Sequence, residues 1–292
     1  MPRYAILAAP SVLGLWPSGV ERLPDALLAA GLQERLDARL AEPVDPPAFD
    51  GTRDPATLIL NPGAIAAYSV ALADAVGDVI DRGELPVVLG GDCSIMLGGL
   101  LALKRRGRFG LLFLDGHADF YQPEAELKGE AASMDLALAA GRGPAVVTDL
   151  ESRGPLVRDE DAVAVGFRDH EDQRREGSQP LPPALRAFDL PAIRGQGLES
   201  AARAAVDHVT RPELDGAWLH LDVDVLDDAV MPAVDYRQPD GLSFDEVAWV
   251  LRAALASGRA VGLEVTIFNP TLDPDGSRAR GIVDCVADGL RG

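Results

Sequence analysis

Short, wholly apolar runs alternate along the chain with longer stretches of helical periodicity, and this alternation most constrains the fold. Residues 87–89 and 111–114 are apolar at every position, which is typical of strands buried on both faces of a sheet. The stretches between such runs carry apolar residues at helical spacing. Strands and helices that alternate in this way form βαβ units. The sequence therefore predicts a mostly parallel sheet with helices on both faces.

The expected elements fill one α/β domain over residues 1–292. Strands are expected at residues 4–8, 86–89, 111–115, 162–166, 217–222 and 260–265. Helices are expected at residues 20–30, 64–81, 95–106, 133–140, 198–209, 244–257 and 278–290. Residues 41–62 and 177–197 are rich in Pro, Gly and charge and are expected to be loops. Neither has the length or low complexity of a linker, so we predict a single three-layer α/β/α domain.

The charge balance and the cysteine count narrow the functional classes. The 292 residues include 46 Asp and Glu but 27 Lys and Arg, which gives a formal net charge of −19. Such a surface repels nucleic acids and anionic membranes, so we expect neither as a partner. No uninterrupted apolar run reaches the roughly 18 residues that a membrane span needs. Two cysteines are too few for a disulfide scaffold.

The apolar N-terminal stretch, residues 4–16, is interpreted as a buried strand and its following loop. Pro10 and Gly14 interrupt it, and no clear small-residue cleavage site follows. A signal peptide is the weaker interpretation for such a pattern. We therefore expect a cytoplasmic protein whose partner is a small-molecule substrate.

Three segments place acids or metal-type ligands where a predicted strand ends. They are Gly-Gly-Asp-Cys-Ser at 90–94, Leu-Asp-Gly-His-Ala-Asp at 114–119, and Leu-Asp-Val-Asp-Val-Leu-Asp at 221–227. In open α/β sheets, ligands bind at the carboxyl ends of the strands. Each segment alone would more often be a turn, a cap or a solvated loop. Their occurrence at three strand ends of one chain favours a common site.

Two runs of ligand-type residues share a spacing of two, which points their side chains to one side of an extended backbone. The runs are Asp115, His117 and Asp119, and His220, Asp222 and Asp224. Clustered carboxylates are costly unless a cation neutralises them, and a divalent metal centre is the simplest cation. Two neighbouring ions can share a water and generate hydroxide at neutral pH. Taken alone, His220 is more often a hydrogen-bonded strand residue, and Cys93 a small buried one.

The order and spacing of these segments resemble the ureohydrolase superfamily of arginases, agmatinases and formimidoylglutamases. The signatures of that superfamily are Gly-Gly-Asp-His-Ser, Asp-Ala-His-x-Asp and Ser-x-Asp-x-Asp-x-x-Asp-Pro. Similarity extends to residues 19–32, 241–243 and 262–270, and so covers nearly the whole chain. The resemblance implies an arginase-like α/β/α fold with a binuclear manganese site at the strand ends. It also implies a homo-oligomer, either a trimer or a hexamer.

The resemblance further implies a ligand set and a reaction. One metal ion would be held by Cys93, Asp115, Asp119 and Asp222, and the other by His117, Asp115, Asp222 and Asp224. Asp115 and Asp222 would bridge the two ions. Relatives attack a guanidino or amidino carbon with a metal-bridging hydroxide, and the tetrahedral intermediate collapses with loss of an amine. Asp119 is thus predicted to be catalytic as well as ligating.

Cys93 stands where most family members have a histidine ligand. A thiolate is softer and favours Zn²⁺, Fe²⁺ or Co²⁺ over Mn²⁺, and the bound metal would drive its deprotonation. The alternative is that Cys93 does not coordinate, which would leave one site weak. We expect two divalent ions, with Mn²⁺ favoured and Zn²⁺, Fe²⁺ or Co²⁺ as alternatives because of Cys93.

Two further departures bear on the substrate. The family glutamate that grips the guanidinium corresponds to Ile267, and the nearby Glu264 has the opposite parity and should point away from the site. Loss of a charge-assisted contact argues against a simple arginine or agmatine substrate. Lys128 replaces the family histidine that is often proposed as the proton shuttle. It is predicted to bind an anionic or neutral substrate or to act as a general acid, and the alternative is a solvated surface lysine.

The segment 165–171 resembles the substrate-binding loop of the family. Asp169 and Glu171 are predicted to bind a substrate ammonium, although both acids could equally be caps. Ile267 is predicted to be a further substrate-binding position. The main hypothesis is a metal-dependent hydrolase of a non-peptide C–N bond of the guanidino or amidino type, which uses a metal-bridging hydroxide. The alternatives are a diverged member acting on a linear amide or modified guanidine, and a non-catalytic metal-binding homologue. A nucleotide-binding loop is not supported, because no Gly-x-Gly-x-x-Gly or Walker sequence occurs.

Overall fold

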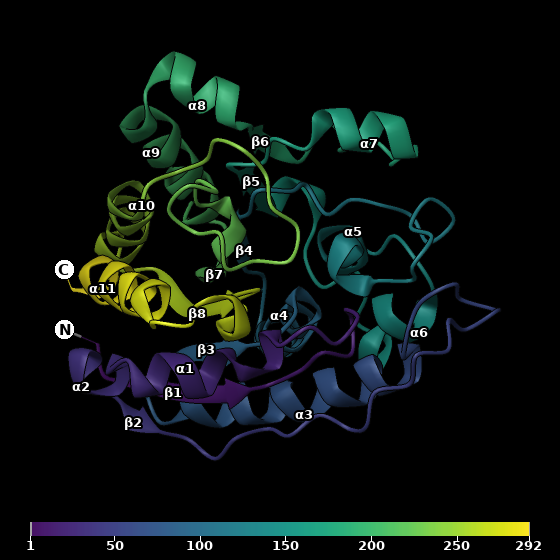
Figure 1. The fold of residues 1–292 in the computed structure, drawn as a ribbon, viewed down its shortest axis with the longest axis horizontal. Coiled ribbons are helices and arrows are strands. Elements are labelled where there is room, and N and C mark those ends of the chain that lie inside the picture. Colours follow the sequence, from purple (N-terminus) through teal and green to yellow (C-terminus); the bar gives the residue numbers. More distant parts are fainter. Residues whose placement is uncertain (1, 292) are drawn as a thin grey trace.

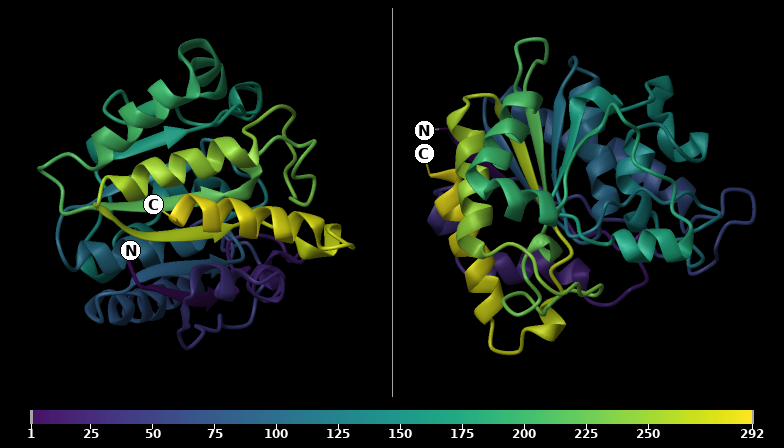
Figure 2. Two further views of the ribbon diagram at one scale, coloured as in Figure 1. Left: turned by 90° about the vertical axis from the view of Figure 1, so that its left-hand side faces the viewer. Right: turned by 90° about the horizontal axis from the view of Figure 1, so that it is seen from above.

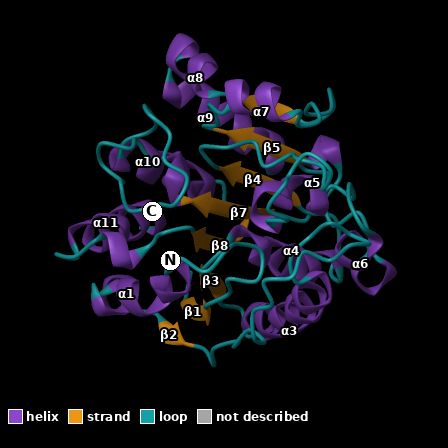
Figure 3. Ribbon diagram, turned by 45° about the vertical axis from the view of Figure 1, so that its right-hand side comes forward, coloured by secondary structure: helices purple, strands orange, loops and turns teal. Residues whose placement is uncertain are grey.

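One fully parallel sheet forms the centre of the molecule in a computed structural model that describes residues 2–291. Its strands run in the order β2-β1-β3-β8-β7-β4-β5-β6 (Figure 3). Their bounds are β1 Tyr4–Ala9, β2 Arg39–Leu40, β3 Leu85–Gly90, β4 Gly110–Leu114, β5 Ala162–Val165, β6 Arg186–Phe188, β7 Ala217–Asp222 and β8 Ala260–Thr266. All six expected strands are present, and the predicted parallel sheet is confirmed.

Helices cover both faces of the sheet, which gives the three predicted layers (Figures 1 and 2). One layer contains α1 Leu23–Ala29, α2 Leu32–Leu36, α8 Leu190–Gln196, α9 Leu198–Val209, α10 Phe244–Ala256 and α11 Ser277–Leu290. The other contains α3 Pro62–Asp81, α4 Met96–Lys104, α5 Asp135–Ala139 and α6 Ala145–Thr148. Helix α7, His170–Glu176, follows β5 and has no buried residue.

Burial on both faces explains why the central strands are apolar at every position. In β4, Leu112 and Leu114 belong to the core beneath the α9–α11 layer. Their neighbours Leu111 and Phe113 belong to the core beneath α3 and α4. A strand packed on two sides has no solvent-facing position for a polar residue. The alternation of side chains therefore fills two cores rather than separating core from solvent.

The prediction of a loop at residues 177–197 is wrong, because this stretch contains β6 and α8. Strand β6 lies at the sheet edge with Arg186 and Ala187 exposed, so it carries no apolar run. Helix α8 begins after Asp189, whose carboxylate caps it by accepting a hydrogen bond of 2.7 Å from the Ala192 backbone N–H. The two-residue edge strand β2 was also not expected. Short edge elements leave too few buried residues to produce a pattern.

By length and hydropathy alone, α3 could cross a membrane, although the chain has no uninterrupted apolar run of that length. In this structure α3 packs on the sheet beside α4, and Leu72 and Val76 on its inner face are fully buried. Of the apolar window, 44% is buried inside the protein.

Candidate metal centre

Four adjacent strands bring the predicted site residues together at the carboxyl ends of the strands. The register pairs Leu114 with Leu221, Leu221 with Val265, and Val265 with Leu89. Strands β4, β7, β8 and β3 therefore end at nearly the same height. The three acid-bearing segments follow β3, β4 and β7, and the Ile267 segment follows β8. The topology thus gathers side chains that lie far apart in the sequence.

The turn after β3 is built to hold Cys93 in place. The Asp92 carboxylate accepts hydrogen bonds from the Ser94 backbone N–H at 2.8 Å and from the Ser11 hydroxyl at 3.0 Å. A Cβ at Gly91 would lie 1.8 Å from the Ser11 carbonyl oxygen, so only glycine fits there. These contacts fix the short 3₁₀ turn that begins at Cys93.

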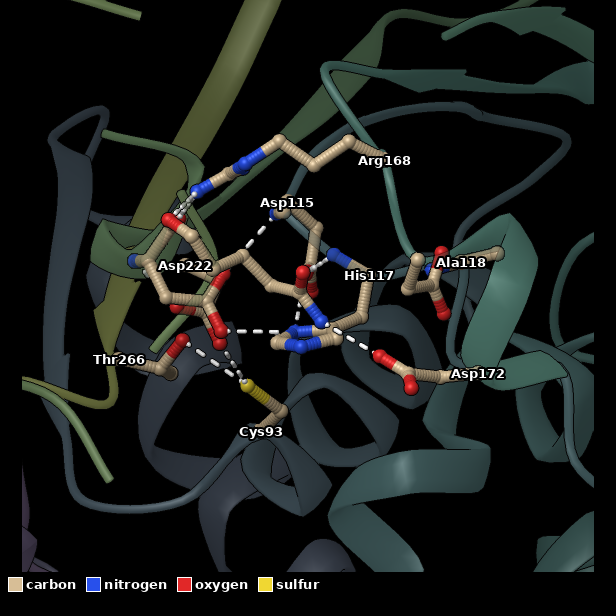
Figure 4. A network of polar contacts seen from close by, with 12 residues as sticks. Cys93, Asp115, His117, Ala118, Arg168, Asp172, Asp222 and Thr266 are labelled. Carbon is tan, nitrogen blue, oxygen red and sulfur yellow. Dashed lines mark hydrogen bonds and ion pairs between the residues drawn. The ribbon is translucent and has the colours of Figure 1, made fainter. Parts of the chain in front are cut away.

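The Cys93 thiol points into the acid cluster. Its Sγ donates to Asp222 Oδ2 at 3.0 Å and lies 3.1 Å from Thr266 Oγ1. Figure 4 shows the sulfur beside both residues, with the His117 ring close by. Burial, followed by the negative charge of Asp222, raises the pKa of the Cys93 thiol well above its usual range. The thiol is therefore protonated unless a cation replaces its proton.

The loop after β4 folds back on the loop after β7. The Asp115 carboxylate accepts the His117 backbone N–H at 2.6 Å. The His117 ring Nδ1 lies 2.8 Å from Asp224 Oδ2, and the Gly116 N–H donates to Asp224 Oδ1 at 2.9 Å. Asp119 has a φ of 43°, in the left-handed region that a non-glycine residue rarely adopts. The segment is thus a tight loop, and it is not extended.

Arg168 stabilises the backbone that carries Asp224. Its Nη2 donates to the carbonyl oxygens of Asp224 at 2.9 Å and Leu226 at 3.2 Å (Figure 4). A Cβ at Gly116 would lie 2.6 Å from Arg168 Nη1, so glycine leaves room for the guanidinium. The Asp222 carboxylate in turn accepts the Asp224 backbone N–H at 2.7 Å. The orientation of both acids is therefore set by backbone contacts.

Buried negative charge is the main electrostatic feature of the site. Burial raises the pKa of Asp115 and Asp222 well above the usual range, and neighbouring carboxylates add to the shift. Burial likewise raises the pKa of Asp119 to about 8. Burial alone would raise the pKa of Asp224, but the charge of His117 outweighs it and lowers the pKa to about 2. The same pairing outweighs burial at His117 and raises its pKa to about 10.

Several polar atoms around the cluster have no hydrogen-bond partner among residues 2–291. They are Asp115 Oδ2, His220 Nε2 and both carboxylate oxygens of Asp135. Buried polar groups are normally paired, so atoms of this kind need an explanation such as an ion. The side chains concerned are buried, with 1% exposure for Asp115 and none for His220 or Asp135.

The ligand atoms form groups of the size that a metal ion requires. Three groups have ligand atoms that all lie within 4.8 Å of one another. They are Cys93, Asp115, His220 and Asp222; Asp115, His117 and Asp224; and Cys93, Asp119 and Asp135. Asp115 belongs to the first two groups, as a bridging carboxylate would. Carboxylate, imidazole and thiolate are all ligands of divalent transition metals. The residues present therefore fit a binuclear centre.

A cleft of about 390 Å³ opens onto the acid cluster. The predicted site residues that line it are Cys93, His117, Asp119, Lys128, Asp169, Asp222, Asp224 and Ile267. Asp115 lies beneath them, and the lining described within residues 2–291 does not include Glu171. Glu171 is exposed on α7, and its neighbour Asp172 faces the cleft instead. Glu171 thus lies outside the cleft lining, and its predicted contact with a substrate ammonium stays a prediction.

Ile267 forms part of the cleft wall in a strained conformation. Its φ of 69° lies in the left-handed region, where a β-branched residue costs about 1–3 kcal/mol. The Ile267 N–H donates to the Gly91 carbonyl at 2.9 Å, which ties the end of β8 to the turn that carries Cys93. The apolar Ile267 side chain lines the cleft.

Asp169 and Lys128 both line the cleft. Asp169 Oδ1 accepts from the Ala118 N–H at 3.2 Å and from Gln173 Nε2 at 2.7 Å. Its Oδ2 is buried and has no partner within the described part of the chain. The Lys128 ammonium is more than half exposed and donates to the Tyr236 hydroxyl at 2.5 Å. Lys128 therefore lies at the rim of the cleft.

Sequence reasoning missed three buried residues that adjoin the cluster. His220 shares the parity of Asp222, but a single histidine in a strand was given no ligand role. Glu264 was expected to point away from the site, and it contacts the His220 ring at 2.7 Å. Asp135 begins α5, where an acid is common, and nothing in the sequence indicates that it is fully buried beside Cys93.

The comparisons with known proteins agree with this geometry. A family model described as "Arginase family" matches residues 2–289. An arginase of Staphylococcus aureus is 28% identical over 96% of this chain and 94% of its own length. The solved arginase of Bacillus caldovelox superposes with a TM-score of 0.88 at 25% identity, over 100% of this chain and 99% of that one. The agmatine ureohydrolase of Thermoplasma volcanium, with a TM-score of 0.69 at 18% identity over 99% and 90%, shares the fold.

The chain belongs to the arginase family. This membership confirms the predicted superfamily, the α/β/α fold and the main functional hypothesis, a metal-dependent amidino hydrolase. It also implies a binuclear metal centre and a small-molecule substrate. The individual ligand assignments, the metal and the substrate stay predictions.

Proposed function

We propose that the chain hydrolyses a C–N bond in a small amidine, modified guanidine or linear amide. One observation carries this proposal. The cleft ends on a complete set of metal-ligand side chains, whereas its wall presents Ile267 at the position of the glutamate that grips a guanidinium. The chemistry of the family is therefore retained, and a main determinant of arginine binding is replaced by an apolar group.

The metal centre of this proposal is supported by the closeness of Cys93 to Asp115 and Asp222, and of His117 to Asp115 and Asp224. Cys93, Asp115, Asp119 and Asp222 would hold one ion, and His117, Asp115, Asp222 and Asp224 the other. Divalent ions held by these residues would supply a water of lowered pKa and would polarise the bond to be cleaved. Mn²⁺ is the family expectation, and the Cys93 thiolate favours Zn²⁺, Fe²⁺ or Co²⁺ at its position.

The side chains of the cleft would orient the substrate and carry protons. Asp119 lines the cleft beside His117, where its carboxylate would accept a proton from the attacking water and return it to the leaving amine. Asp169 Oδ2 would accept a hydrogen bond from a substrate N–H or ammonium. Lys128 at the rim would contact an anionic or neutral part of the substrate.

The polar lining of the cleft supports a small charged or strongly polar substrate. Besides Asp169, the acids Asp172 and Glu176 and the cations Arg175 and Arg237 face the opening. Charges of both signs at the rim suit a molecule that itself carries opposite charges or hydrogen-bonding groups at one end. An apolar segment near the reacting carbon would pack on Ile267.

Location and assembly follow the family resemblance. We propose a cytoplasmic enzyme that forms a homo-oligomer, either a trimer or a hexamer. The acidic surface, with a net charge of −19, supports a protein that avoids nucleic acids and anionic membranes.

The proposal is tested by measuring ammonia, urea and amine release from matched series of amidines, guanidines and linear amides. The enzyme is reloaded separately with Mn²⁺, Zn²⁺ and Co²⁺. Turnover of an amidine or linear amide above that of arginine, abolished in Asp119→Asn, is the expected result. Preferred hydrolysis of arginine would contradict the substrate assignment. No turnover of any series in a fully metal-loaded chain would contradict hydrolysis itself.

A further inference from the structure

His220 is a buried histidine whose ring is held rigidly beneath the acid cluster. It lies on β7 two residues before Asp222 and has no exposed surface. The ring stacks on Phe113 of the neighbouring strand, with centroids 4.7 Å apart and planes 7° from parallel. Such packing leaves the imidazole one orientation, with its two nitrogens facing different partners.

Glu264 fixes one of the two ring nitrogens, Nδ1. The Glu264 Oε1 lies 2.7 Å from His220 Nδ1, and both side chains are fully buried. This contact favours the tautomer with a proton on Nδ1 and a free lone pair on Nε2. A carboxylate that orients the distal nitrogen is the usual partner of a metal-ligating histidine. Glu264 thus stands where such a partner would stand.

The inner nitrogen of the ring faces the cluster with nothing to bind. His220 Nε2 has no hydrogen-bond partner in the described part of the chain, residues 2–291. It lies 3.9 Å from Asp115 Oδ2, which is also unpartnered there. One ligand atom each from His220, Asp115, Cys93 and Asp222 lie within 4.8 Å of one another. Two buried acceptors at this separation leave room for a cation between them.

We infer that His220 is a metal ligand, and that in place of Asp119 it completes with Cys93, Asp115 and Asp222 a four-ligand site for a borderline-soft divalent ion such as Zn²⁺ or Co²⁺. His220 supplies from β7 an imidazole that position 93 lacks. Four ligands of nitrogen, oxygen and sulfur type match the tetrahedral preference of such ions. This inference rests on the proposed function only in placing the ion within the same binuclear centre.

Two other arrangements of these residues make different predictions. In the first, His220 and Glu264 are only a buried structural pair. Substituting either residue would then lower the stability of the metal-free and the metal-loaded protein equally. In the second, the ion lies on the other side of the sulfur, where Cys93 also groups with Asp119 and Asp135. The three arrangements differ in which substitution removes the thiolate–metal contact.

The test uses Co²⁺ alone as a spectroscopic probe of the metal-free full-length chain. Titration follows the thiolate-to-cobalt charge-transfer band and the visible bands that are intense in four-coordinate sites. We expect both in the native chain. His220→Asn should weaken binding at this position at least about 100-fold, and Glu264→Gln, which keeps an acceptor for Nδ1, about 10- to 100-fold. The matched control is His208→Asn, since His208 lies on α9 and contacts the Glu160 carbonyl.

The melting temperature is measured for each variant with and without Co²⁺. A stabilisation by Co²⁺ that is lost in His220→Asn and reduced in Glu264→Gln supports the inference. Unchanged Co²⁺ affinity in either variant overturns it, as does loss of the thiolate band in Asp135→Asn but not in His220→Asn. If His220→Asn does not fold, the Glu264→Gln result decides. This test measures cobalt binding and stability rather than hydrolysis. A chain that binds cobalt through His220 but shows no turnover in the separate hydrolysis assay would contradict the proposed function alone.

Discussion

Two regions of this protein bury carboxylates completely, and they neutralise them in different ways. Near the start of β5, Asp161 is fully buried. Arg108 binds both of its oxygens, at 2.7 and 2.8 Å, and Arg211 contacts one of them. At the opposite edge of the sheet, Asp115 and Asp222 are equally buried. Within residues 2–291, neither forms an ion pair with a lysine or arginine.

Burial of an acid therefore does not by itself indicate function. A buried charge must be paired, and the Asp161 region supplies the pair from its own chain. In the Asp115 region the acids face each other, their pKa values rise, and acceptor atoms stay unpartnered. Among residues 2–291 Asp115 and Asp222 have no lysine or arginine partner, and a bound cation would supply the positive charge that pairs them. We therefore assign a stabilising ion pair to the Asp161 region and metal binding to the Asp115 region.

The largest expected difference between the regions comes from removing one acid in each. Asp222→Asn should lower metal affinity and hydrolytic turnover at least about 100-fold with a small change in metal-free stability. Asp161→Asn should lower the free energy of unfolding by about 2 kcal/mol and leave the turnover of the folded enzyme unchanged. Metal titration, turnover and denaturant unfolding of both variants check this. Equal loss of stability in both would remove the distinction.

Removal of metal should affect the stability that comes from the Asp115 region and leave the contribution of the Asp161 region unchanged. Each ion that binds only the folded state stabilises it by about 2.7 kcal/mol at a concentration 100 times its dissociation constant. Chelation should therefore lower the melting temperature of the native chain, and Asp161→Asn should show the same metal-dependent difference. Calorimetry with and without chelator measures it. A melting temperature that ignores chelator and added metal would contradict the assignment.

Ile267→Glu adds a further acid to the metal-binding region. With no cation opposite it, the new carboxylate should destabilise the metal-free chain. A guanidinium substrate would supply that cation, so affinity for arginine or agmatine should rise by about tenfold or more. Ile267→Gln is the matched control because it adds polarity without charge. Steady-state kinetics of both variants decide the point, and equal gains would show that charge pairing is not the cause.

The pH dependence of the metal-free chain gives the smallest expected effect. Burial raises the folded-state pKa of Asp119 to about 8, above its unfolded value of about 3.9. The folded state then binds more protons, so stability falls as pH rises from about 4 to about 8. Pairing with Asp224 raises the pKa of His117 to about 10, which acts in the same direction at higher pH. The melting temperature should drop by about 3 °C or more between pH 6 and pH 9.

Metal loading should reverse the sign of this pH dependence. Bound ions require deprotonated ligands, so metal affinity rises with pH. The loaded chain should therefore gain stability over the range in which the metal-free chain loses it. Parallel melting curves at matched ionic strength make the comparison. Curves of the same slope would mean that the acids near Asp119 do not bind the metal.

The sequence predicted the sheet because both faces of its central strands are buried, which leaves an unmistakable apolar run. It could not predict β6 or α8, whose exposed edge positions carry no such run. The acid cluster was predicted through a spacing of two in extended backbone. The structure gathers the same residues through a tight loop at Asp119 and a 3₁₀ turn at Asp224. His220 and Asp135 were missed because their burial depends on elements distant in the sequence.

The metal content per chain tests directly whether the acid cluster holds two metal ions. Protein purified without chelator is analysed for Mn, Zn, Fe and Co, in the native form and as Cys93→His. The account predicts about two ions per native chain, since the ligand groups on either side of Asp115 each fit one. No bound metal in either form, with thermal stability unaffected by added Mn²⁺ or Zn²⁺, would contradict it.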